Sequence, residues 1–271
     1  LTRAHLFPYV WIRGAGLAVL NRRNRRAWIG AGLATLTAVL VVSPWMMRNW
    51  VRFDRVAPVS MNGGYNFWKS FNPASTGTES GYDVSLFFGL EEKDIDATGY
   101  REGWRFIREN PGRALALAPL KEGYFWGLER FFYIGLRNES WGPVPALVSW
   151  SLLPVIPITQ LFWVFFAPIG LLLAPASSTR RETFLLLGFH IVLHLVFNAE
   201  ARYHIPLVPV LLAAASAGFV SCLTRETRRA AGIRIGTLLR ALPVLITIPV
   251  LFFWCWEVIS EWLEIRGVFG I

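Results

Sequence analysis

The stretch SPWMMRNWVRFDRVAPVSMNGGYNFWKSFNPASTG, residues 43–77, decides the interpretation of the whole chain. It begins inside residues 27–47, a run of 21 residues without a charged side chain, which is about the length that crosses a hydrocarbon core of ~30 Å. A proline, two indoles, a cation and an amide follow at Pro44, Trp45, Arg48, Asn49 and Trp50. Such residues are typical of a chain that leaves lipid for water, so we expect an apolar helix to stop here.

The second half of the stretch predicts a polar loop that carries aromatic side chains. Asn62, Gly63 and Gly64 predict a turn that glycine accommodates most easily. Rings, amides and one ammonium follow it, at Tyr65, Asn66, Phe67, Trp68, Lys69 and Asn72. This mixture suits a sugar or a phosphate as ligand. An ordered extracytoplasmic connection whose rings lie on the membrane surface would have the same composition.

Length and composition place the chain among membrane proteins. Its 271 residues include 13 Trp and 20 Phe, and the mean hydropathy is +0.42. Several long runs carry no charge, which an ordinary soluble domain does not show. The only cysteines, Cys222 and Cys255, both lie in apolar runs, so we expect no disulfide framework. The sequence predicts a polytopic membrane protein.

The positive charge is confined to three short segments, and this predicts the topology. Residues 21–26, 176–182 and 224–240 together hold 11 Arg and two Glu, which accounts for the whole net charge of +9. Residues 48–142 carry 12 basic and 12 acidic side chains. By the positive-inside rule the three Arg-rich segments are cytoplasmic and the long neutral segment is outside. A nucleic-acid-binding patch would not be divided among loops in this way, so nucleic acid is excluded as a partner.

We therefore predict an all-α integral membrane protein with about six transmembrane helices and a partly helical exoplasmic loop domain. The predicted spans are residues 4–20, 27–47, a span centred on residues 161–173 that an interfacial approach precedes within residues 143–174, and residues 183–198, 203–223 and 241–260. Residues 1–47 form two of these spans, residues 48–142 form the exoplasmic domain, and residues 143–271 form four spans with a short outer C-terminal tail. This arrangement implies a multi-pass protein of the bacterial inner membrane, with its large loop periplasmic or extracellular.

The exoplasmic segment contains two helical patterns. Residues 93–110 place apolar side chains at helical spacing, and Asn110-Pro111-Gly112 ends that pattern. A second helix is expected to start near Arg113. Its continuation, residues 120–133, interleaves charges with rings, as in a helix that lies along a membrane surface.

Ionisable side chains gather between the fourth and fifth predicted spans. Glu200, Arg202, Tyr203 and His204 fall in a short connection between two apolar arms, where they need water, one another or a ligand. Glu200 and Arg202 could form a solvated pair, worth only ~0–1 kcal/mol. Alternatively, Arg202 could bind phosphate, because a guanidinium matches phosphate oxygens with two parallel hydrogen bonds.

Two histidines four residues apart have a spacing found in metal sites. His190 and His194 lie on one face of a predicted span, a spacing that could hold a metal. No acidic third ligand accompanies them within that span. We expect hydrogen bonds between helices instead, and predict no metal site.

Several of these short patterns resemble one family of enzymes. They are Pro44-Trp45, Arg48-Asn49, Asn62-Gly63-Gly64, Asn66, Trp68, Asn72-Pro73, Glu200-Ala201-Arg202-Tyr203 and the run from Pro206 to Pro209. Together they resemble the C-terminal portion of the polytopic glycosyltransferases of superfamily C, the relatives of protein mannosyltransferase and lipid A aminoarabinose transferase. The resemblance covers nearly the whole chain.

The resemblance implies transfer of a sugar from a polyprenyl-phosphate donor to a lipid, glycan or protein acceptor. Arg202, with Arg48 or Lys69, would bind the donor phosphate. The implied substrate-binding residues are Asn62, Gly63, Gly64, Asn66, Trp68, Asn72, Glu200, Tyr203 and His204. No cofactor is implied beyond the lipid-linked sugar, and the bilayer itself is the other partner. The family's catalytic acid lies on an earlier loop, so we expect it upstream of Leu1 and expect this chain alone to be inactive.

Two other classes of function fit the same sequence. A transporter or flippase of a lipid-linked substrate would also use kinked spans, but it would place polar groups near the middle of the bilayer. A non-catalytic assembly subunit would need no catalytic acid.

Overall fold

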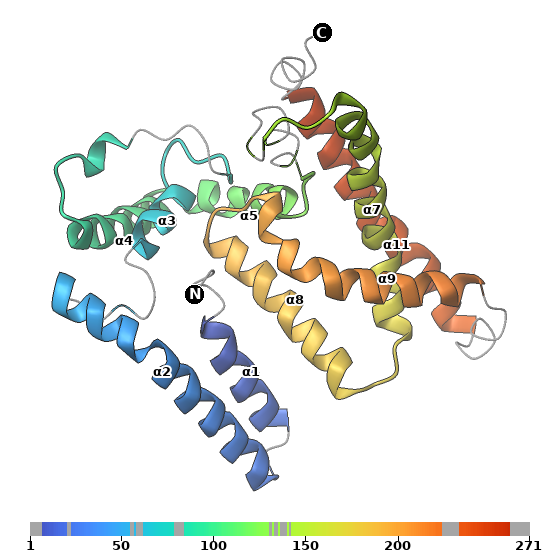
Figure 1. Ribbon diagram of the computed structural model, residues 1–271, viewed down its shortest axis with the longest axis horizontal. Coiled ribbons are helices and arrows are strands. Elements are labelled where there is room, and N and C mark those ends of the chain that lie inside the picture. The colour runs from blue at the N-terminus through green and yellow to red at the C-terminus, as the bar shows by residue number, and fades with distance from the viewer. Residues whose placement is uncertain are drawn as a thin grey trace. The chain divides into compact units, whose positions relative to one another are not determined.

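The computed structural model describes residues 7–20, 23–54, 57, 62–78, 84–129, 132, 135, 140, 142–223 and 233–260, and the elements named in them are all helical (Figure 1). The predicted all-α class is confirmed for this part of the chain. The described chain divides into two compact units, Leu1–Ala118 with Phe184–Asn198 and Pro119–Thr183 with Ala199–Ile271. The predicted outer C-terminal tail lies outside the described residues, as does most of the third Arg-rich segment.

Three helical stretches in the described residues are long and apolar enough to cross a membrane. They are Arg25–Phe53, Pro154–Leu173 and Ile205–Leu223, and Pro243–Ile259 is a shorter apolar helix. In the first stretch, only 6% of an 18-residue apolar segment is buried inside the protein. Its apolar side chains therefore face outward, as contact with lipid requires. These helices mark the chain as a membrane protein, with three of the six predicted spans meeting this standard.

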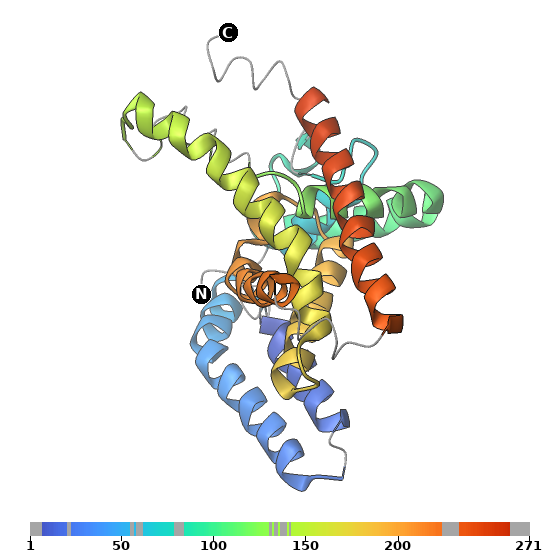
Figure 2. The same cartoon turned by 90° about the vertical axis from the view of Figure 1, so that its right-hand side faces the viewer.

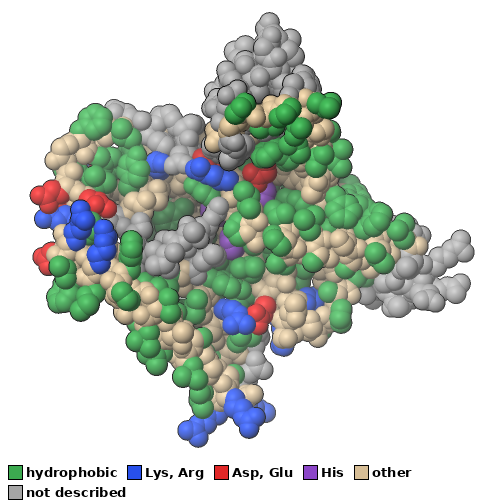
Figure 3. Space-filling model, in the orientation of Figure 1, with side chains coloured by type: hydrophobic (Ala, Val, Ile, Leu, Met, Phe, Trp, Pro, Cys, Tyr) green, Lys and Arg blue, Asp and Glu red, His purple; other side chains and the backbone are tan. Residues whose placement is uncertain are grey.

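The first unit opens with a helical hairpin. Helix α1, Phe7–Leu20, runs antiparallel to α2, Arg25–Phe53, in both views (Figures 1 and 2). Asn24 caps α2, since its side chain accepts a hydrogen bond of 3.0 Å from the Arg26 N–H. Lys and Arg side chains gather at the end of the hairpin where α1 connects to α2 (Figure 3). Helix α8, Ser178–Val196, also contacts α1, where the rings of Tyr9 and Phe189 lie 5.2 Å apart.

The expected end of the helix near Met47 is wrong, because α2 continues through Pro44 to Phe53. A proline inside a helix leaves the carbonyl four residues earlier without its N–H donor. Here that carbonyl belongs to Leu40, and the Ser43 hydroxyl donates a hydrogen bond of 2.9 Å to it. The helix ends instead at Asp54, which adopts a left-handed conformation with φ 53° and donates its N–H to the Trp50 carbonyl over 2.9 Å.

The expected glycine turn is also wrong, because Gly63 and Gly64 begin a helix. Helix α3, Gly63–Ser70, packs on α4, Glu92–Glu109. A Cβ on Gly64 would lie 1.8 Å from the Asp96 carbonyl oxygen, and one on Gly99 would lie 2.3 Å from the Gly64 backbone. Gly64 is not among the described glycines with positive φ. Glycine is therefore required here for close approach of two backbones and not for a turn.

The helices α3, α4 and α5 form a small aromatic core. Helix α4 and its end at Asn110 confirm the predicted helix over residues 93–110, and α5, Pro111–Phe125, begins two residues before the predicted start. Four buried apolar side chains pack together between these helices, from Phe67, Phe71, Phe106 and Leu117. The ring of Phe197, which follows α8, lies 6.4 Å from that of Phe67.

The second unit is a bundle of apolar helices. Helix α7, Ala146–Leu173, packs on α9, Val208–Leu223, and on α11, Ile233–Ser260. Gly170 and Gly218 allow the backbones of α7 and α9 to touch, since a Cβ on Gly170 would lie 1.8 Å from the Ala214 carbonyl oxygen. Small residues at such a crossing are typical of helices that pack in membranes.

The prediction that residues 120–133 form a helix along the membrane surface is wrong. Helix α5 ends at Phe125, and its last residues are buried in the protein: Lys121 and Phe125 are each 0% exposed and Tyr124 is 9% exposed. The Tyr124 ring packs edge-on against Phe253 of α11 at 5.2 Å. The alternation of rings and charges in this segment therefore reflects a protein interior that includes polar groups.

Candidate functional site

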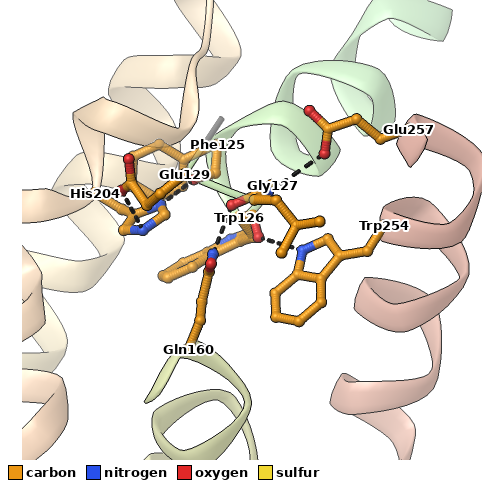
Figure 4. A network of polar contacts seen from close by, with 9 residues as sticks. Phe125, Trp126, Gly127, Glu129, Gln160, His204, Trp254 and Glu257 are labelled. Atoms are coloured by element: carbon orange, nitrogen blue, oxygen red, sulfur yellow. Dashed lines mark hydrogen bonds and ion pairs between the residues drawn. The ribbon is translucent and has the colours of Figure 1, made fainter. Parts of the chain in front are cut away.

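The turn that follows α5 is held by side chains from two helices of the second unit (Figure 4). Gln160 of α7 donates a hydrogen bond of 2.6 Å to the Gly127 carbonyl. Trp254 of α11 donates one of 2.9 Å to the Trp126 carbonyl, and Glu257 accepts one of 3.3 Å from the Leu128 N–H. Irregular backbone has no helix or strand partners of its own, so buried N–H and C=O groups in a turn need partners such as these.

His204 connects this turn to the segment between α8 and α9 (Figure 4). Its Nδ1 lies 2.5 Å from the Phe125 carbonyl oxygen, and its Nε2 lies 3.0 Å from Oε1 of Glu129. The imidazole is 1% exposed, and the ring of Trp126 lies nearly parallel to it at 6.1 Å. The ring of Trp163 packs edge-on at 5.3 Å. His204 is therefore fixed by an oxygen at each nitrogen and by rings on its faces and edge.

Arg202 and Glu200 form an ion pair two residues before His204. Arg202 Nε lies 2.5 Å from Glu200 Oε2, and the guanidinium lies 5.4 Å from the Tyr203 ring centre. The Glu200 side chain is 2% exposed, whereas that of Arg202 is 40% exposed. The buried carboxylate holds one edge of the guanidinium and leaves part of the side chain exposed. A partly exposed guanidinium can donate hydrogen bonds to an anion.

The other two predicted phosphate-binding cations lie in the first unit. Arg48, in α2, donates a hydrogen bond of 3.1 Å to Oδ1 of Asn49, and its guanidinium lies 4.9 Å from the Trp45 ring. Lys69, in α3, is 9% exposed, and its ammonium lies 5.1 Å from the Tyr65 ring. Both cations are thus placed against aromatic faces, an attraction worth ~0.5–2 kcal/mol.

The predicted substrate-binding residues of residues 62–72 form and terminate α3. Asn72 is 2% exposed, and its Nδ2 donates to the Trp68 carbonyl over 2.9 Å and to that of Lys69 over 3.2 Å. Its Oδ1 accepts a hydrogen bond of 2.8 Å from the Ala74 N–H. Asn72 therefore caps the C-terminal end of the helix. Trp68 is 7% exposed, with its ring 4.8 Å from that of Phe87.

The remaining members of this group lie at the start of α3. Asn62 precedes the helix, and its carbonyl accepts the Asn66 N–H over 3.0 Å. The Gly64 N–H donates a hydrogen bond of 2.6 Å to Oδ1 of Asp96, so a carboxylate from α4 occupies the positive end of α3. A Cβ on Gly63 would lie 2.6 Å from the Tyr100 hydroxyl. These residues are used in joining α3 to α4.

Two adjacent residues of α5 have perturbed acidity that the sequence did not indicate. Burial lowers the pKa of Lys121 to about 7. Burial raises the pKa of Glu122 to about 7, and a hydrogen bond from Trp126 opposes part of that rise. Alternating charges and rings on a helix predict exposure to solvent. The altered pKa values of Lys121 and Glu122 depend on burial in tertiary contacts of α5, which the sequence does not show.

His190 and His194 each bond to a backbone carbonyl. His190 Nδ1 lies 2.9 Å from the Leu186 carbonyl oxygen, and His194 Nδ1 lies 3.3 Å from that of Asn198. Among the described residues, no group of three His, Cys, Asp or Glu side chains is placed to hold a metal ion.

Comparison with known proteins adds no relative. No protein-family model, no curated protein and no solved structure matches the chain. The resemblance described above stays a prediction. Sequence reasoning missed four residues of this site: Glu129, Gln160, Trp254 and Glu257. Each contacts a partner 33 to 129 positions away in the sequence, and no local motif marks any of them.

Proposed function

We propose that the protein transfers a sugar from a polyprenyl-phosphate donor to a lipid, glycan or protein acceptor at the outer face of the membrane. The observation that carries this proposal is the pair formed by Arg202 and Glu200. A buried carboxylate fixes a guanidinium that is 40% exposed, at the start of a helix apolar enough to cross a membrane. A polyprenyl phosphate carries its charge at this boundary between lipid and water, while its prenyl chain stays in lipid.

In the proposed reaction, the acceptor hydroxyl attacks the anomeric carbon and the polyprenyl phosphate leaves. Negative charge grows on the phosphate as the glycosidic bond breaks. Arg202 would donate hydrogen bonds to the phosphate oxygen on which this charge develops. Donors aimed at developing charge lower the barrier more than they strengthen substrate binding. Glu200 and the Tyr203 ring would keep the guanidinium in place, so that little reorganisation is needed during the reaction.

Replacing Arg202 tests the proposal directly. Arg202→Ala is expected to lower turnover by ~10²- to 10³-fold, because one charged donor to the transition state is lost. Arg202→Lys keeps the positive charge but loses the paired N–H donors of the guanidinium. Its turnover should lie between that of the unaltered protein and that of Arg202→Ala. The measurement is the rate of sugar transfer from polyprenyl-phosphate mannose and from polyprenyl-phosphate aminoarabinose, in native membranes at matched protein levels.

Arg101 supplies the matched control for this experiment. It pairs with Glu102 on α4, its side chain is 69% exposed, and it lies outside the Arg202 segment. Arg101→Ala should therefore retain the turnover of the unaltered protein. Turnover of Arg202→Ala equal to that of Arg101→Ala would reduce Arg202 to a surface partner of Glu200.

The proposal also requires six spans with residues 48–142 outside. It predicts that a cysteine at position 74 reacts with an impermeant thiol reagent in intact cells, whereas one at position 178 reacts only after lysis. Ala74 and Ser178 are both exposed, so burial does not limit either reaction. Cys222 and Cys255 are first replaced by serine to remove the background. Labelling at 178 with protection at 74 would invert the topology and remove the proposed function with it.

A further inference from the structure

Helix α4 has an outward-facing stripe that contains no carboxylate. Positions four, three, four and four residues apart follow one side of a helix, and here they hold Lys93, Ala97, Tyr100, Trp104 and Arg108. We call these five residues the α4 stripe. The side of α4 that packs on α3 is buried, and the stripe lies away from it. The stripe therefore has two rings in its middle and a cation at each end.

The two rings of the α4 stripe are held on one side and exposed on the other. The ring of Phe67, from α3, lies 5.3 Å from that of Trp104 and 5.6 Å from that of Tyr100. Even so, Trp104 is 51% exposed and Tyr100 is 39% exposed. Tyr and Trp have an apolar body and a polar edge, so they are enriched at the boundary between lipid and water.

The cations of the stripe are far enough apart to flank both rings. Lys93 and Arg108 are separated by ~22 Å of helix, at 1.5 Å per residue. The Lys93 side chain is 43% exposed, and its ion pair with Glu91 is open to solvent and therefore weak. Arg108 is also exposed. Long cationic side chains at such positions can extend to lipid phosphates while their apolar stems cover the surface below.

The charged residues beside the stripe bond within the protein. Arg101 and Arg105 both pair with Glu102, over 3.2 Å and 2.5 Å, and the Glu102 side chain is only 10% exposed. Asp96 accepts the Gly64 N–H over 2.6 Å. These carboxylates are thus occupied or covered, and they do not repel phosphate from the stripe. Arg101 is assigned no lipid contact.

Helix α2 brings α3 and α4 close to the boundary of the membrane. Its 29 residues extend over ~43 Å, which exceeds a hydrocarbon core of ~30 Å. Trp45 and Trp50, near its end, are 43% and 56% exposed, as indoles at a membrane boundary are. Between them Asn49 donates a hydrogen bond of 3.0 Å to the Ala57 carbonyl, so the chain is still beside α2 at that point. From Ala57 the chain reaches Gly63, where α3 begins, over at most ~22 Å.

We propose that the α4 stripe lies on the membrane that α2 crosses. The rings of Tyr100 and Trp104 lie among the lipid headgroups, and Lys93 and Arg108 bind lipid phosphates. Because α2 already holds the protein in the bilayer, this second contact is intramolecular, and a weak attraction is enough to keep it formed. The inference does not depend on the proposed glycosyl transfer, and its test needs no turnover.

Fluorescence quenching tests the contact in the whole chain. Cys222 and Cys255 are replaced by serine, and a fluorescent thiol label is attached at Ala97→Cys or at Glu92→Cys. The protein is reconstituted into vesicles of phosphatidylcholine and phosphatidylglycerol that include a lipid with a nitroxide on its headgroup. Glu92 is exposed on the same helix but is not part of the stripe, so it is the matched control. The nitroxide is expected to quench the label at position 97 and to leave the label at position 92 bright.

Two substitutions in the stripe should lower the quenching at position 97. Arg108→Gln removes one cation near an anionic surface and should weaken the contact about fivefold. Trp104→Ser removes the apolar area of a half-exposed ring and should weaken it by a similar factor, about fivefold. Thermal unfolding in detergent, where no bilayer is present, checks that each variant is still folded. Arg108→Gln decides the matter if Trp104→Ser loosens the packing against Phe67.

The outcomes that overturn the proposal are distinct. If the lipid nitroxide does not quench the label at position 97, the stripe does not lie on the membrane. Access of a water-soluble quencher would then place the stripe in water, and protection from both quenchers would mean that protein, such as a second copy of this chain, covers it. Equal quenching at positions 92 and 97 would mean that the stripe is not the contacting side of α4. Quenching at position 97 that folded Arg108→Gln protein retains in full would overturn the role of Arg108.

Discussion

Gly64→Ala is expected to lower the midpoint of thermal unfolding and to separate α3 from α4. The added Cβ would lie 1.8 Å from the Asp96 carbonyl oxygen, a backbone atom inside a helix that cannot rotate away. Relief requires movement of a whole helix, and overpacking of this kind costs ~1–3 kcal/mol or more. The shift would also lengthen the hydrogen bond of 2.6 Å from the Gly64 N–H to Asp96. The measurement is thermal unfolding of the purified protein in detergent.

Gly112→Ala is the control for this substitution. Gly112 lies in the first turn of α5, and a Cβ there would meet no atom within 4 Å. Alanine is a better helix former than glycine by ~0.5–1 kcal/mol, so Gly112→Ala should match or exceed the stability of the unaltered protein. Equal stability of the two variants would mean that the backbones of α3 and α4 do not touch at Gly64.

Helix positions outside the predicted loops could be read from the sequence because they follow from composition. An uncharged run of about 20 residues has few solutions other than a helix in lipid. Among the described residues, the stretches Arg25–Phe53, Pro154–Leu173 and Ile205–Leu223 are long and apolar enough to meet this condition. The apolar spacing of residues 93–110 and the sequence Asn110-Pro111-Gly112 likewise predict helix α4 and its end. Local rules suffice where the physical constraint is local.

The errors at Pro44 and at Gly64 have a common cause. A proline predicts a helix break only if the carbonyl it leaves free finds no other donor, and the Ser43 hydroxyl supplies one to Leu40. Two glycines predict a turn only if no neighbouring element packs where their side chains would be. Here the backbone of α4 at Asp96 and Gly99 lies against Gly64 and leaves no room for a Cβ. In both places one hydrogen bond or one tertiary contact overrides the usual local preference.

The candidate site was partly within reach of sequence reasoning. Glu200, Arg202 and His204 stand out as ionisable residues between apolar runs. Glu129 does not, because it is one of 12 acidic residues in residues 48–142 and only its contact with His204 distinguishes it. That contact joins positions 75 residues apart, and no spacing rule predicts it.

Lys121→Met is expected to stabilise the protein at neutral pH and to flatten the rise in stability above it. The pKa of Lys121 is about 7 in the folded protein against 10.5 for the ordinary group, because the side chain is 0% exposed. The folded protein therefore binds fewer protons than the unfolded chain between about pH 7 and 10.5, and its stability rises with pH across that window. Methionine removes this cost, which amounts to several kcal/mol below pH 7 at ~1.4 kcal/mol per pKa unit.

Glu122→Gln is the matched variant for the opposite side of neutrality. The pKa of Glu122 is raised from 4.5 to about 7, so the folded protein keeps a proton that the unfolded chain loses, and stability falls as pH rises through that window. The two residues together place a minimum of stability near pH 7. The midpoint temperature of thermal unfolding, measured in detergent from pH 5 to about pH 10, should therefore increase on both sides of neutrality in the unaltered protein. Lys121→Met should remove only the alkaline rise and Glu122→Gln only the acidic one. A Lys121→Met protein that is less stable than the unaltered protein at pH 7, with the alkaline rise unchanged, would show that Lys121 stays charged in the folded protein.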